Sequence, residues 1–373
     1  MKIKVAIPYT GKEEYKSIKK IMFSGKFVSG KLVKKFEENF SKYIGLKSAA
    51  AFNSGTASLH AAMNSLNLKK NDEVIIPSIS FMSTATAVLH QGCTPIFCDV
   101  NLDDYCLNIE DFKKKITRNT KAVIPVHFAG NACKIDEIVK IAKQKKISVI
   151  EDCAQAHGTK YKNKKVGSFG DISCFSFYAT KHMTTGEGGI LCSNKKKLTE
   201  KSKIFRNHGL VSRNDHVTLG YNYRMNELAA AMGLEQLKKL DKFNSIRRKN
   251  SLYLLKELEK RKSKWFEVQK IDKSIFHTYF WCPLRIINSK ISIDDVIKKL
   301  KKKNIEIRTR YKFPLYKQRV IQNLKIKSSQ NYKKLYLKNS EKIAGRIFGL
   351  PNHHKLNKNQ LNYIINTVAN LYD

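Results

Sequence analysis

The segment that decides the fold runs from Ser148 to Ser193 and reads SVIEDCAQAHGTKYKNKKVGSFGDISCFSFYATKHMTTGEGGILCS. Three short apolar runs lie in or beside it, each of the length expected for a buried strand: 147–150, 172–177 and 190–192. The first run ends in the acidic pair Glu151 and Asp152, and the second leads into Lys181. Open α/β sheets bind ligands where their strands end, so a carboxylate and an amine at this edge predict a functional site.

Lys181 differs from most lysines of this chain in its sequence surroundings. A lone lysine is ordinarily a solvated surface charge, but Lys181 follows the apolar run FSFYAT and precedes small, turn-forming residues. This setting predicts a side chain in a cleft, where partial loss of solvent lowers the pKa of the amine and lets it form a Schiff base. The usual partner of such a lysine is pyridoxal phosphate, whose ring nitrogen is held by a carboxylate. Asp152 is the candidate for that carboxylate.

Six segments together resemble the DegT/DnrJ/EryC1/StrS family of pyridoxal-phosphate-dependent sugar aminotransferases. They are FNSGTASLHAA (52–62), PVHFAG (125–130), EDCAQAHG (151–158), FSFYATKHMTTGEGG (175–189), FRNHG (205–209) and GYNYRMNE (220–227). They follow one another in the family order, and the resemblance extends over nearly the whole chain. The glycines at 186–189 alone would indicate no more than a turn. The family implies the aspartate-aminotransferase-like fold (pyridoxal phosphate fold type I), an α/β class.

The pattern of apolar runs indicates the same architecture. Strand-like runs at 72–77, 94–100 and 121–126 alternate with amphipathic helical runs at 108–116 and 134–145, which favours a mostly parallel sheet covered on both faces. Later segments predict a smaller α+β domain: a strand at 276–286, a helix beginning at 292, a strand at 305–309 and a helix at 357–371. A long helical segment, 226–259 with a possible break, links them. We therefore expect a large domain with an N-terminal arm over residues 1–245 and a small domain over 246–373.

The resemblance implies which residues hold the phosphate of the cofactor. Gly55 and Thr56 precede a helix, whose N-terminus is suited to an anion, although an ordinary N-cap is the alternative from the residues alone. Ser176 resembles a second phosphate contact. Asn222, in the GYNYR motif, resembles the asparagine that reaches the phosphate of the neighbouring subunit. This assignment implies a homodimer with shared active sites.

Other matching residues are expected around the cofactor ring. Phe81 resembles the aromatic residue that covers the ring, and core packing is its alternative role. Gln155 resembles the residue near the phenolic oxygen of the cofactor. Lys181 and Asp152 are the expected catalytic residues. We expect His127, in contrast, to be a structural histidine.

The reaction that the resemblance implies is a two-stage transamination. An amino acid, glutamate by family habit, gives its amino group to the cofactor, which passes it to a nucleotide-linked keto-deoxy sugar. Lys181 acts as the general base, and Asp152 keeps the ring nitrogen protonated. Relatives that dehydrate sugars carry histidine in place of the lysine, so Lys181 argues against dehydration. A keto-cyclitol or another ring ketone is an alternative acceptor.

The charge of the chain raises one alternative of another class, a basic nucleic-acid-binding protein. Seventy-one Lys and Arg residues against 31 Asp and Glu give a formal net charge of +40. The lysines are spread along the whole chain, and neither zinc-finger spacing nor an RNA-binding aromatic motif accompanies them. We therefore expect no nucleic-acid partner and read the excess as a compositional bias.

Composition and cysteine usage limit the remaining classes. The 373 residues are 42% hydrophobic and contain no run of membrane-spanning length. The first residues lack the apolar core of a signal peptide, so we expect a cytoplasmic protein without membrane insertion. Eight cysteines form no CxxC pair, and Cys98, Cys174 and Cys192 fall in apolar runs. We expect reduced, buried thiols and no metal site.

Overall fold

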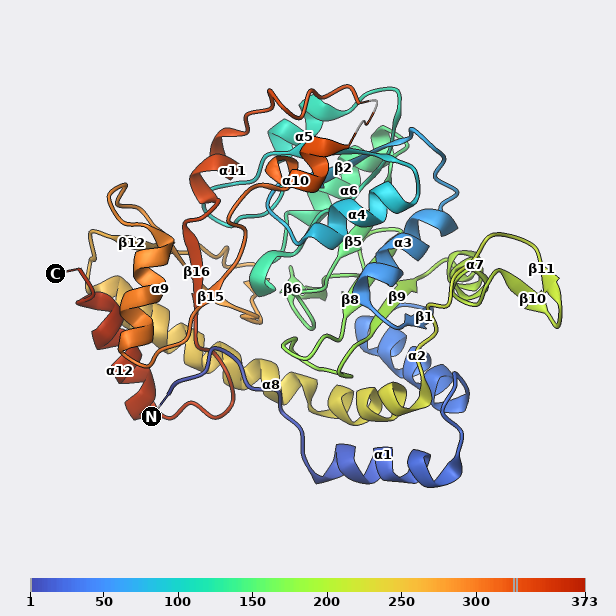
Figure 1. Cartoon of the computed structure of the whole chain (residues 1–373), viewed down its shortest axis with the longest axis horizontal. Helices are drawn as coiled ribbons and strands as arrows, with labels where there is room; N and C mark the ends of the chain where they lie inside the picture. The colour runs from blue at the N-terminus through green and yellow to red at the C-terminus, as the bar shows by residue number, and fades with distance from the viewer. Residues whose placement is uncertain (1, 325, 327, 373) are drawn as a thin grey trace.

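The computed structural model describes residues 2–324, 326 and 328–372, and its centre is a seven-stranded sheet (Figure 1). The strand order is β1-β9-β8-β5-β4-β2-β3. Their bounds are β1 Ser48–Phe52, β2 Glu73–Pro77, β3 Thr94–Cys98, β4 Thr120–Val123, β5 Ser148–Asp152, β8 Ile172–Ser176 and β9 Gly189–Ser193. Strand β9 runs antiparallel to β1 and β8, and the other pairs are parallel. The predicted α/β fold with a mostly parallel sheet is confirmed.

Helices cover both faces of this sheet because alternate residues of each strand point to opposite sides. In β2, Ile75 packs in a cluster with α2, α5 and α6, whereas Val74 and Ile76 pack with α3, α4 and α7. The covering helices are α2 Lys31–Ile44, α3 Gly55–Ser65, α4 Met82–His90, α5 Ile109–Lys115, α6 Ile135–Gln144 and α7 Lys196–Arg206, whereas α1 Lys12–Ser24 lies outside this layer. Burial on both faces explains why the strands are continuous apolar runs.

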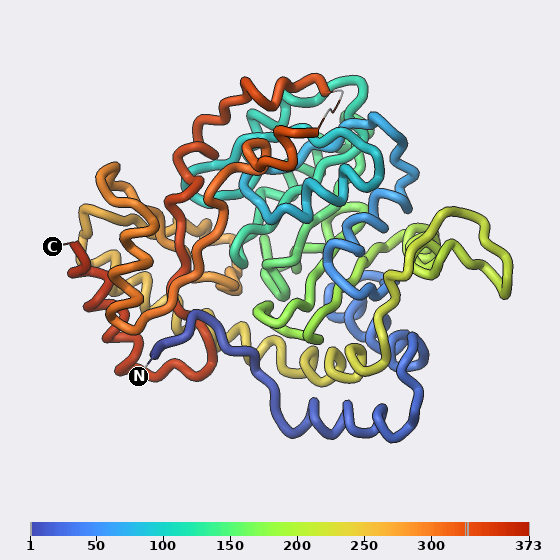
Figure 2. The backbone as a smooth tube through the Cα atoms, in the orientation of Figure 1, coloured from blue at the N-terminus to red at the C-terminus, as the bar shows by residue number. Residues whose placement is uncertain are grey.

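A second, antiparallel sheet has the order β12-β14-β16-β15 and packs on α9 and α12, as expected for an α+β unit. The bounds are β12 Phe266–Val268, β14 Cys282–Ile286, β15 Arg308–Thr309, β16 Ile347–Leu350, α9 Ile293–Lys302 and α12 Lys358–Ala369. The N-terminal arm lies beside this sheet, since Ile3 forms a parallel bridge with Ile305 (Figure 2). Both chain ends therefore meet at the small sheet.

One continuous helix, α8 (Glu227–Lys260), passes from the large sheet to the small one (Figure 1). Near its start Gln236 bonds Glu14 of α1, and near its end Tyr253 bonds Asn362 of α12. Asn226 caps it by accepting from Ala229 N at 2.8 Å. The break considered for this segment is absent, and residue 245, the predicted boundary, lies inside α8.

Two predicted strands are shorter than expected. The run at 276–286 divides into β13 (Ile275–Phe276) and β14, because Thr278 N and Trp281 N donate to the carbonyls of Gly130 and Ala129. Tyr279 between them has a left-handed φ of 49°. The run at 305–309 forms only β15, since Ile305 pairs with the N-terminal arm instead.

The segment between β15 and β16 returns to the large sheet. Tyr332 Oη donates to Pro95 O at 2.6 Å, and Gln330 bonds both the N–H and the carbonyl of Phe97 on the outer strand β3. This segment contains η2 Leu315–Lys317, α10 Arg319–Asn323 and α11 Lys338–Ile343. The predicted C-terminal domain thus forms the second sheet and also packs against the large one, and a division at 245 stays a prediction.

The remaining elements are short: η1 Phe128–Gly130, β6 Lys160–Tyr161, β7 Lys164–Lys165, β10 Leu210–Ser212 and β11 Asp215–His216. The β10–β11 hairpin projects from the body of the molecule (Figure 1). All eight cysteines are buried and free, as predicted. None of the helices in the described part of the chain combines the length and apolar character that a membrane crossing requires.

Candidate active site

Asp152 is the last residue of β5, at the edge of the sheet where its parallel neighbours also end. Its side chain is 4% exposed and accepts two hydrogen bonds, from Thr84 Oγ1 and from Ala154 N, both at 3.1 Å. Burial raises the pKa of Asp152, against the opposing effects of the Ala154 N–H and Lys181. A carboxylate has about four acceptor positions, so Asp152 keeps acceptor capacity for a cationic N–H group.

Lys181 lies in the loop between β8 and β9, and its side chain is partly buried. Its Nζ is 4.5 Å from the centroid of the Phe280 ring and forms no hydrogen bond or ion pair with any described residue. Burial lowers the pKa of Lys181 from 10.5 to about 7; Asp152 opposes this change, and Arg308 and Arg310 add to it. A substantial fraction of the amine is therefore neutral and nucleophilic at neutral pH.

Glu151, the other member of the acidic pair, points to a different environment. It is fully buried and accepts hydrogen bonds from Gly167 N, Phe169 N and Gly170 N at 2.7 to 2.8 Å. A fourth bond joins it to His127 Nε2 at 3.0 Å. These four donors use the acceptor capacity of the carboxylate, so Glu151 fixes the loop after β7.

His127, Glu151 and Cys153 place their ligand atoms within 4.8 Å of one another, a separation that would suit a metal ion. However, His127 Nδ1 already accepts from Cys133 N at 3.1 Å, and its Nε2 donates to Glu151. No lone pair of the histidine or the carboxylate is then left for a cation. The structural role expected for His127 agrees with these contacts.

The helix N-terminus predicted to hold phosphate lies at the end of β8. Ser54 is the N-cap of α3 and accepts from Ala57 N at 3.1 Å, so the N-cap alternative describes Ser54. Gly55 and Thr56 begin the helix and leave backbone donors without intrahelical partners. Gly55 lies so close to Ser176 that a Cβ at position 55 would be 2.8 Å from the Ser176 Cβ. The structure therefore brings these three predicted residues together in a cradle that a larger residue would fill.

Phe81 and Gln155 are the residues predicted to surround the cofactor ring, and that role stays a prediction. Phe81 precedes α4 and is 53% exposed, which excludes the alternative role in the core. Gln155 accepts from Ala129 N at 3.1 Å and donates from Nε2 to Tyr311 Oη at 3.2 Å. These two hydrogen bonds fix the orientation of the Gln155 amide. Gln155 lies in the loop that follows Asp152 at the end of β5.

Asn222 is an exposed residue whose backbone lies next to the phosphate cradle. Its carbonyl accepts from Asn53 Nδ2 at 3.3 Å, and Asn53 N donates to Tyr223 O at 2.9 Å. The side chain of Asn222 forms no hydrogen bond with any described residue, whereas Arg224 of the same motif donates to Asn207 Oδ1 at 2.8 Å. That Asn222 binds the cofactor phosphate of a neighbouring subunit stays a prediction.

Sequence reasoning missed two arginines and an aromatic residue of this cleft. Arg308 lies with its guanidinium 4.5 Å from the Phe280 ring centroid, the same ring that Lys181 contacts. Arg310 lies 5.7 Å from the ring of Phe81. The sequence does not distinguish the two arginines, because they are two of 71 lysines and arginines. Arg308 lies in the short strand β15 and Arg310 follows it.

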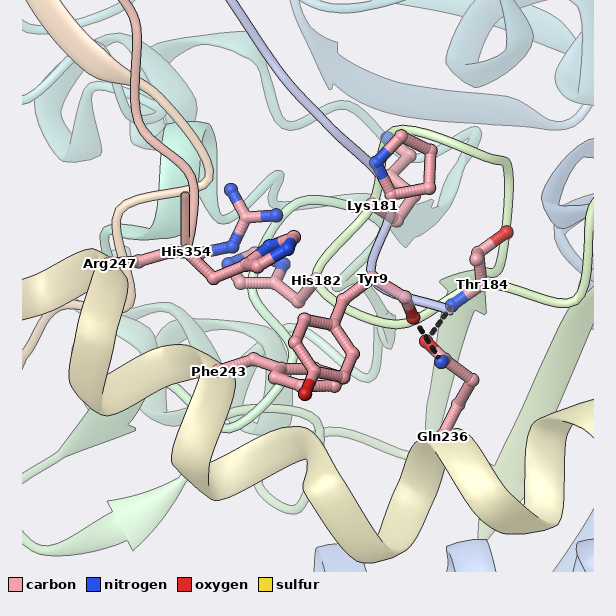
Figure 3. Close-up of a pocket in the computed structure, with 9 residues that line it drawn as sticks. Tyr9, Lys181, His182, Thr184, Gln236, Phe243, Arg247 and His354 are labelled. Atoms are coloured by element: carbon pink, nitrogen blue, oxygen red, sulfur yellow. Dashed lines mark hydrogen bonds between the residues drawn. The ribbon is translucent and has the colours of Figure 1, made fainter. Parts of the chain in front are cut away.

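A small pocket extends from Lys181 to α8, and the N-terminal arm forms one of its walls (Figure 3). Gln236 of α8 ties this wall in place: it accepts from Thr184 N at 3.2 Å and donates to Tyr9 O at 2.6 Å. Tyr9 packs its ring against Phe243 and His354, with centroids 4.6 and 4.4 Å apart. The arm therefore belongs to the surroundings of the reactive lysine.

Pyridoxal phosphate fits the residues that converge here. A buried carboxylate with spare acceptor capacity suits a protonated ring nitrogen, and the exposed face of Phe81 suits a flat ring. The cradle of Gly55, Thr56 and Ser176 presents helix N–H donors to a phosphate.

Comparison with known proteins gives the same result from independent data. The model of the DegT/DnrJ/EryC1/StrS aminotransferase family matches residues 8–369. GDP-perosamine synthase of Escherichia coli O157:H7 is 34% identical over 345 residues, covering 92% of this chain and 91% of that protein. UDP-4-amino-4,6-dideoxy-N-acetyl-beta-L-altrosamine transaminase of Campylobacter jejuni is 32% identical over 367 residues, covering 92% and 90%.

A solved structure extends the comparison to three dimensions. Helicobacter pylori PseC, an aminotransferase involved in the biosynthesis of pseudoaminic acid, superposes with a TM-score of 0.91 at 28% identity. The match covers 100% of this chain and 99% of that one. The chain therefore belongs to the DegT/DnrJ/EryC1/StrS aminotransferase family and is a transaminase that depends on pyridoxal phosphate.

Proposed function

We propose that this enzyme transfers the amino group of glutamate to a nucleotide-linked keto-deoxy sugar, for amino-sugar and polysaccharide biosynthesis. The observation that carries the proposal is Lys181: a partly buried amine of lowered pKa, in the electrostatic field of Asp152, at the carboxyl edge of the sheet. The names of the two relatives, which include a GDP-sugar and a UDP-sugar enzyme, support a nucleotide sugar as acceptor.

The residues described above would hold the cofactor as follows. Asp152 would bind the ring nitrogen, Phe81 would cover the ring and Gln155 would lie beside the phenolic oxygen. Gly55, Thr56, Ser176 and Asn222 would bind the phosphate. When bound, pyridoxal phosphate supplies an electron-accepting ring that stabilises negative charge developing at a substrate carbon.

Lys181 would do the proton transfer of both half-reactions. In the first half-reaction the neutral Nζ would remove the proton from the α-carbon of glutamate and pass it to the bound cofactor. In the second half-reaction Nζ would take a proton back from the cofactor and give it to the sugar carbon that carried the ketone. A pKa near 7 suits both steps, because each protonation state is populated at neutral pH.

A homodimer with shared active sites is the second part of the proposal. Exposed apolar side chains lie on and just after the projecting β10–β11 hairpin, where Leu219 is 90% exposed. Others are Phe23, in the last turn of α1, and Val28, in the loop that follows it. Surfaces of this kind usually pack against a partner. Asn222 lies a few residues after the hairpin and is exposed, so its side chain is accessible to a neighbouring subunit.

Mixed dimers test the shared site. Lys181→Ala and Asn222→Ala proteins, each weakly active alone, are unfolded together and refolded as an equal mixture. If Asn222 serves the partner's phosphate, half of the dimers are mixed and each has one intact site, so about a quarter of wild-type activity returns. Absence of recovery, with dimers present in solution, would place Asn222 in its own subunit's site.

The acceptor is identified by a half-reaction experiment. The enzyme is converted to its pyridoxamine form with glutamate, and a panel of GDP-, UDP- and dTDP-linked keto-deoxy sugars is added while the visible absorbance of the cofactor is followed. Return of the absorbance with one sugar identifies the ketone and its nucleotide. If only a keto-cyclitol restores it, the acceptor assignment is wrong and transamination stands.

Attachment of the cofactor is tested separately. Borohydride should fix the cofactor covalently to wild-type protein, and Lys181→Ala should abolish this stable label. A label retained in Lys181→Ala would assign the attachment to another lysine.

A further inference from the structure

Two histidines near Lys181 are buried and have no hydrogen-bond partner within the protein. His157 is 0% and His182 is 2% exposed, and neither ring nitrogen of either side chain bonds any described residue. Their ring centroids are 5.3 Å apart. Buried polar groups are normally satisfied by protein or by ordered water. The ring nitrogens of this histidine pair therefore point to a hydrogen-bonding occupant that is not a protein group.

His182 lines the small pocket that extends from Lys181 to α8 (Figure 3). The centre of a water molecule can occupy about 10 Å³ of this pocket, which is about the space that one ordered water needs. The rim of the pocket lies near the surface, because Pro8 is exposed and His354 is half-buried. Water in the pocket can therefore exchange with solvent past the N-terminal arm.

The charges that face His182 favour water over a metal ion. Arg247 of α8 lines the same pocket and repels a cation, as the amine of Lys181 does when it is protonated. Burial, followed by the neighbouring His157, holds the pKa of His182 well below its usual range. Arg247, Lys181 and His277 act in the same direction. The His182 ring is therefore neutral at neutral pH, with one nitrogen that donates and one that accepts.

We propose that His182 relays protons between Lys181 and solvent through ordered water in this pocket, an inference that rests on the proposed transamination. Lys181 Nζ takes up the α-proton of the amino donor and becomes an ammonium group. One of its protons then passes to water and one returns from water, so the number of protons on Nζ is unchanged. A neutral imidazole supports this exchange because it accepts at one nitrogen while it donates from the other. His182 acts through Lys181 and is thus a positioning residue.

The test measures how much of the α-proton reaches the cofactor. Enzyme loaded with pyridoxal phosphate reacts with unlabelled glutamate in D₂O, is quenched within the first half-time, and its pyridoxamine phosphate is analysed by mass spectrometry. Protium at the newly formed C4′–H bond comes from the α-carbon, whereas deuterium comes from solvent through Nζ. His182→Leu should raise the protium fraction at least about twofold, because exchange of Nζ with solvent is slowed.

His182→Asn is the matched variant, since asparagine has nearly the shape of leucine but keeps groups that can bond the same water. Its protium fraction should stay near that of wild type. An unchanged fraction in His182→Leu, or an equal rise in both variants, would overturn the relay.

A crystal structure of the wild-type enzyme tests the water itself, also where a variant does not fold. Ordered water should lie within about 3.2 Å of a ring nitrogen of His182, and a dry pocket would overturn the relay. Failure of wild-type enzyme to form pyridoxamine phosphate from glutamate would instead overturn the proposed donor. The two failures are therefore distinct.

Discussion

Glu151 and Asp152 are neighbours at the end of strand β5, yet the surroundings of their two carboxylates differ completely. The carboxylate of Glu151 accepts four hydrogen bonds from its own protein. The carboxylate of Asp152 accepts two, and the nearby Lys181 and Arg308 make no hydrogen bond or ion pair with described residues. Buried polar groups are normally satisfied. We therefore propose that the cofactor and the substrate bind on the incomplete side.

The largest expected difference between the two regions is in activity. Asp152→Asn keeps the shape of the side chain but removes the charge that would hold a protonated ring nitrogen, so the rate of the glutamate half-reaction should fall about 10²- to 10³-fold. Stopped-flow absorbance of cofactor-saturated enzyme measures this. Activity within a few-fold of wild type would show that the ring nitrogen has another partner.

Glu151→Gln should have the opposite profile, with a large effect on stability. The amide places N–H groups against donors that it cannot satisfy, which should lower the free energy of unfolding by about 2 to 4 kcal/mol. Urea unfolding, with Asp152→Asn as the matched variant, measures the difference. The expectation that Glu151 contributes more to stability than Asp152 would be wrong if Asp152→Asn were the less stable of the two proteins.

Lys181→Met should stabilise the cofactor-free protein. In the folded chain the pKa of Lys181 is about 7 instead of 10.5, so at pH values between these the unfolded chain binds a proton that the folded chain does not. The cost of the buried amine is full below pH 7 and declines as the pH rises toward 10.5. Lys181→Met should therefore gain about 1 to 3 kcal/mol at pH 6.5 and less at pH 9. A gain independent of pH would mean that the lysine keeps its ordinary pKa.

Phe81→Leu should have the smallest effect. Loss of the aromatic face should weaken cofactor binding about 2- to 10-fold and leave the unfolding free energy nearly unchanged, because Phe81 is half exposed. Fluorescence titration of the apo protein with pyridoxal phosphate measures this. Phe313→Leu, at another exposed phenylalanine, is the control and should bind normally.

Much of the fold and the central pair of the site followed from the sequence. Continuous apolar runs predicted the parallel strands because those strands are buried on both faces, and the ends of two such runs located Asp152 and Lys181. The split of the 276–286 run was not predictable, because the hydrogen-bond partners that interrupt it, Ala129 and Gly130, are more than a hundred residues away. The sequence of the 276–286 run alone does not show which distant residues it will bond.

The same limit explains why Arg308 was missed and why the structural role of Glu151 was not predicted. Both carboxylates end the same apolar run, and only the folded loop at 167–170 shows which of them is already satisfied. Arg308 is one of many basic residues, and it becomes distinctive only when the small sheet places it on the ring that Lys181 contacts. The lack of a counter-charge beside Arg308 becomes visible only in the folded molecule.

Because helix α8 is unbroken, its length fixes the position of the small sheet relative to the large one. The number of residues in this helix must therefore stay constant. Each residue of an α-helix turns the chain by about 100° and advances it by about 1.5 Å. A single insertion between the contacts to α1 and those to α12 would therefore rotate the whole small sheet, and Arg308 with it, away from Lys181. A loop of the same length would absorb such a change. Insertions and deletions should thus not be tolerated between Gln236 and Tyr253.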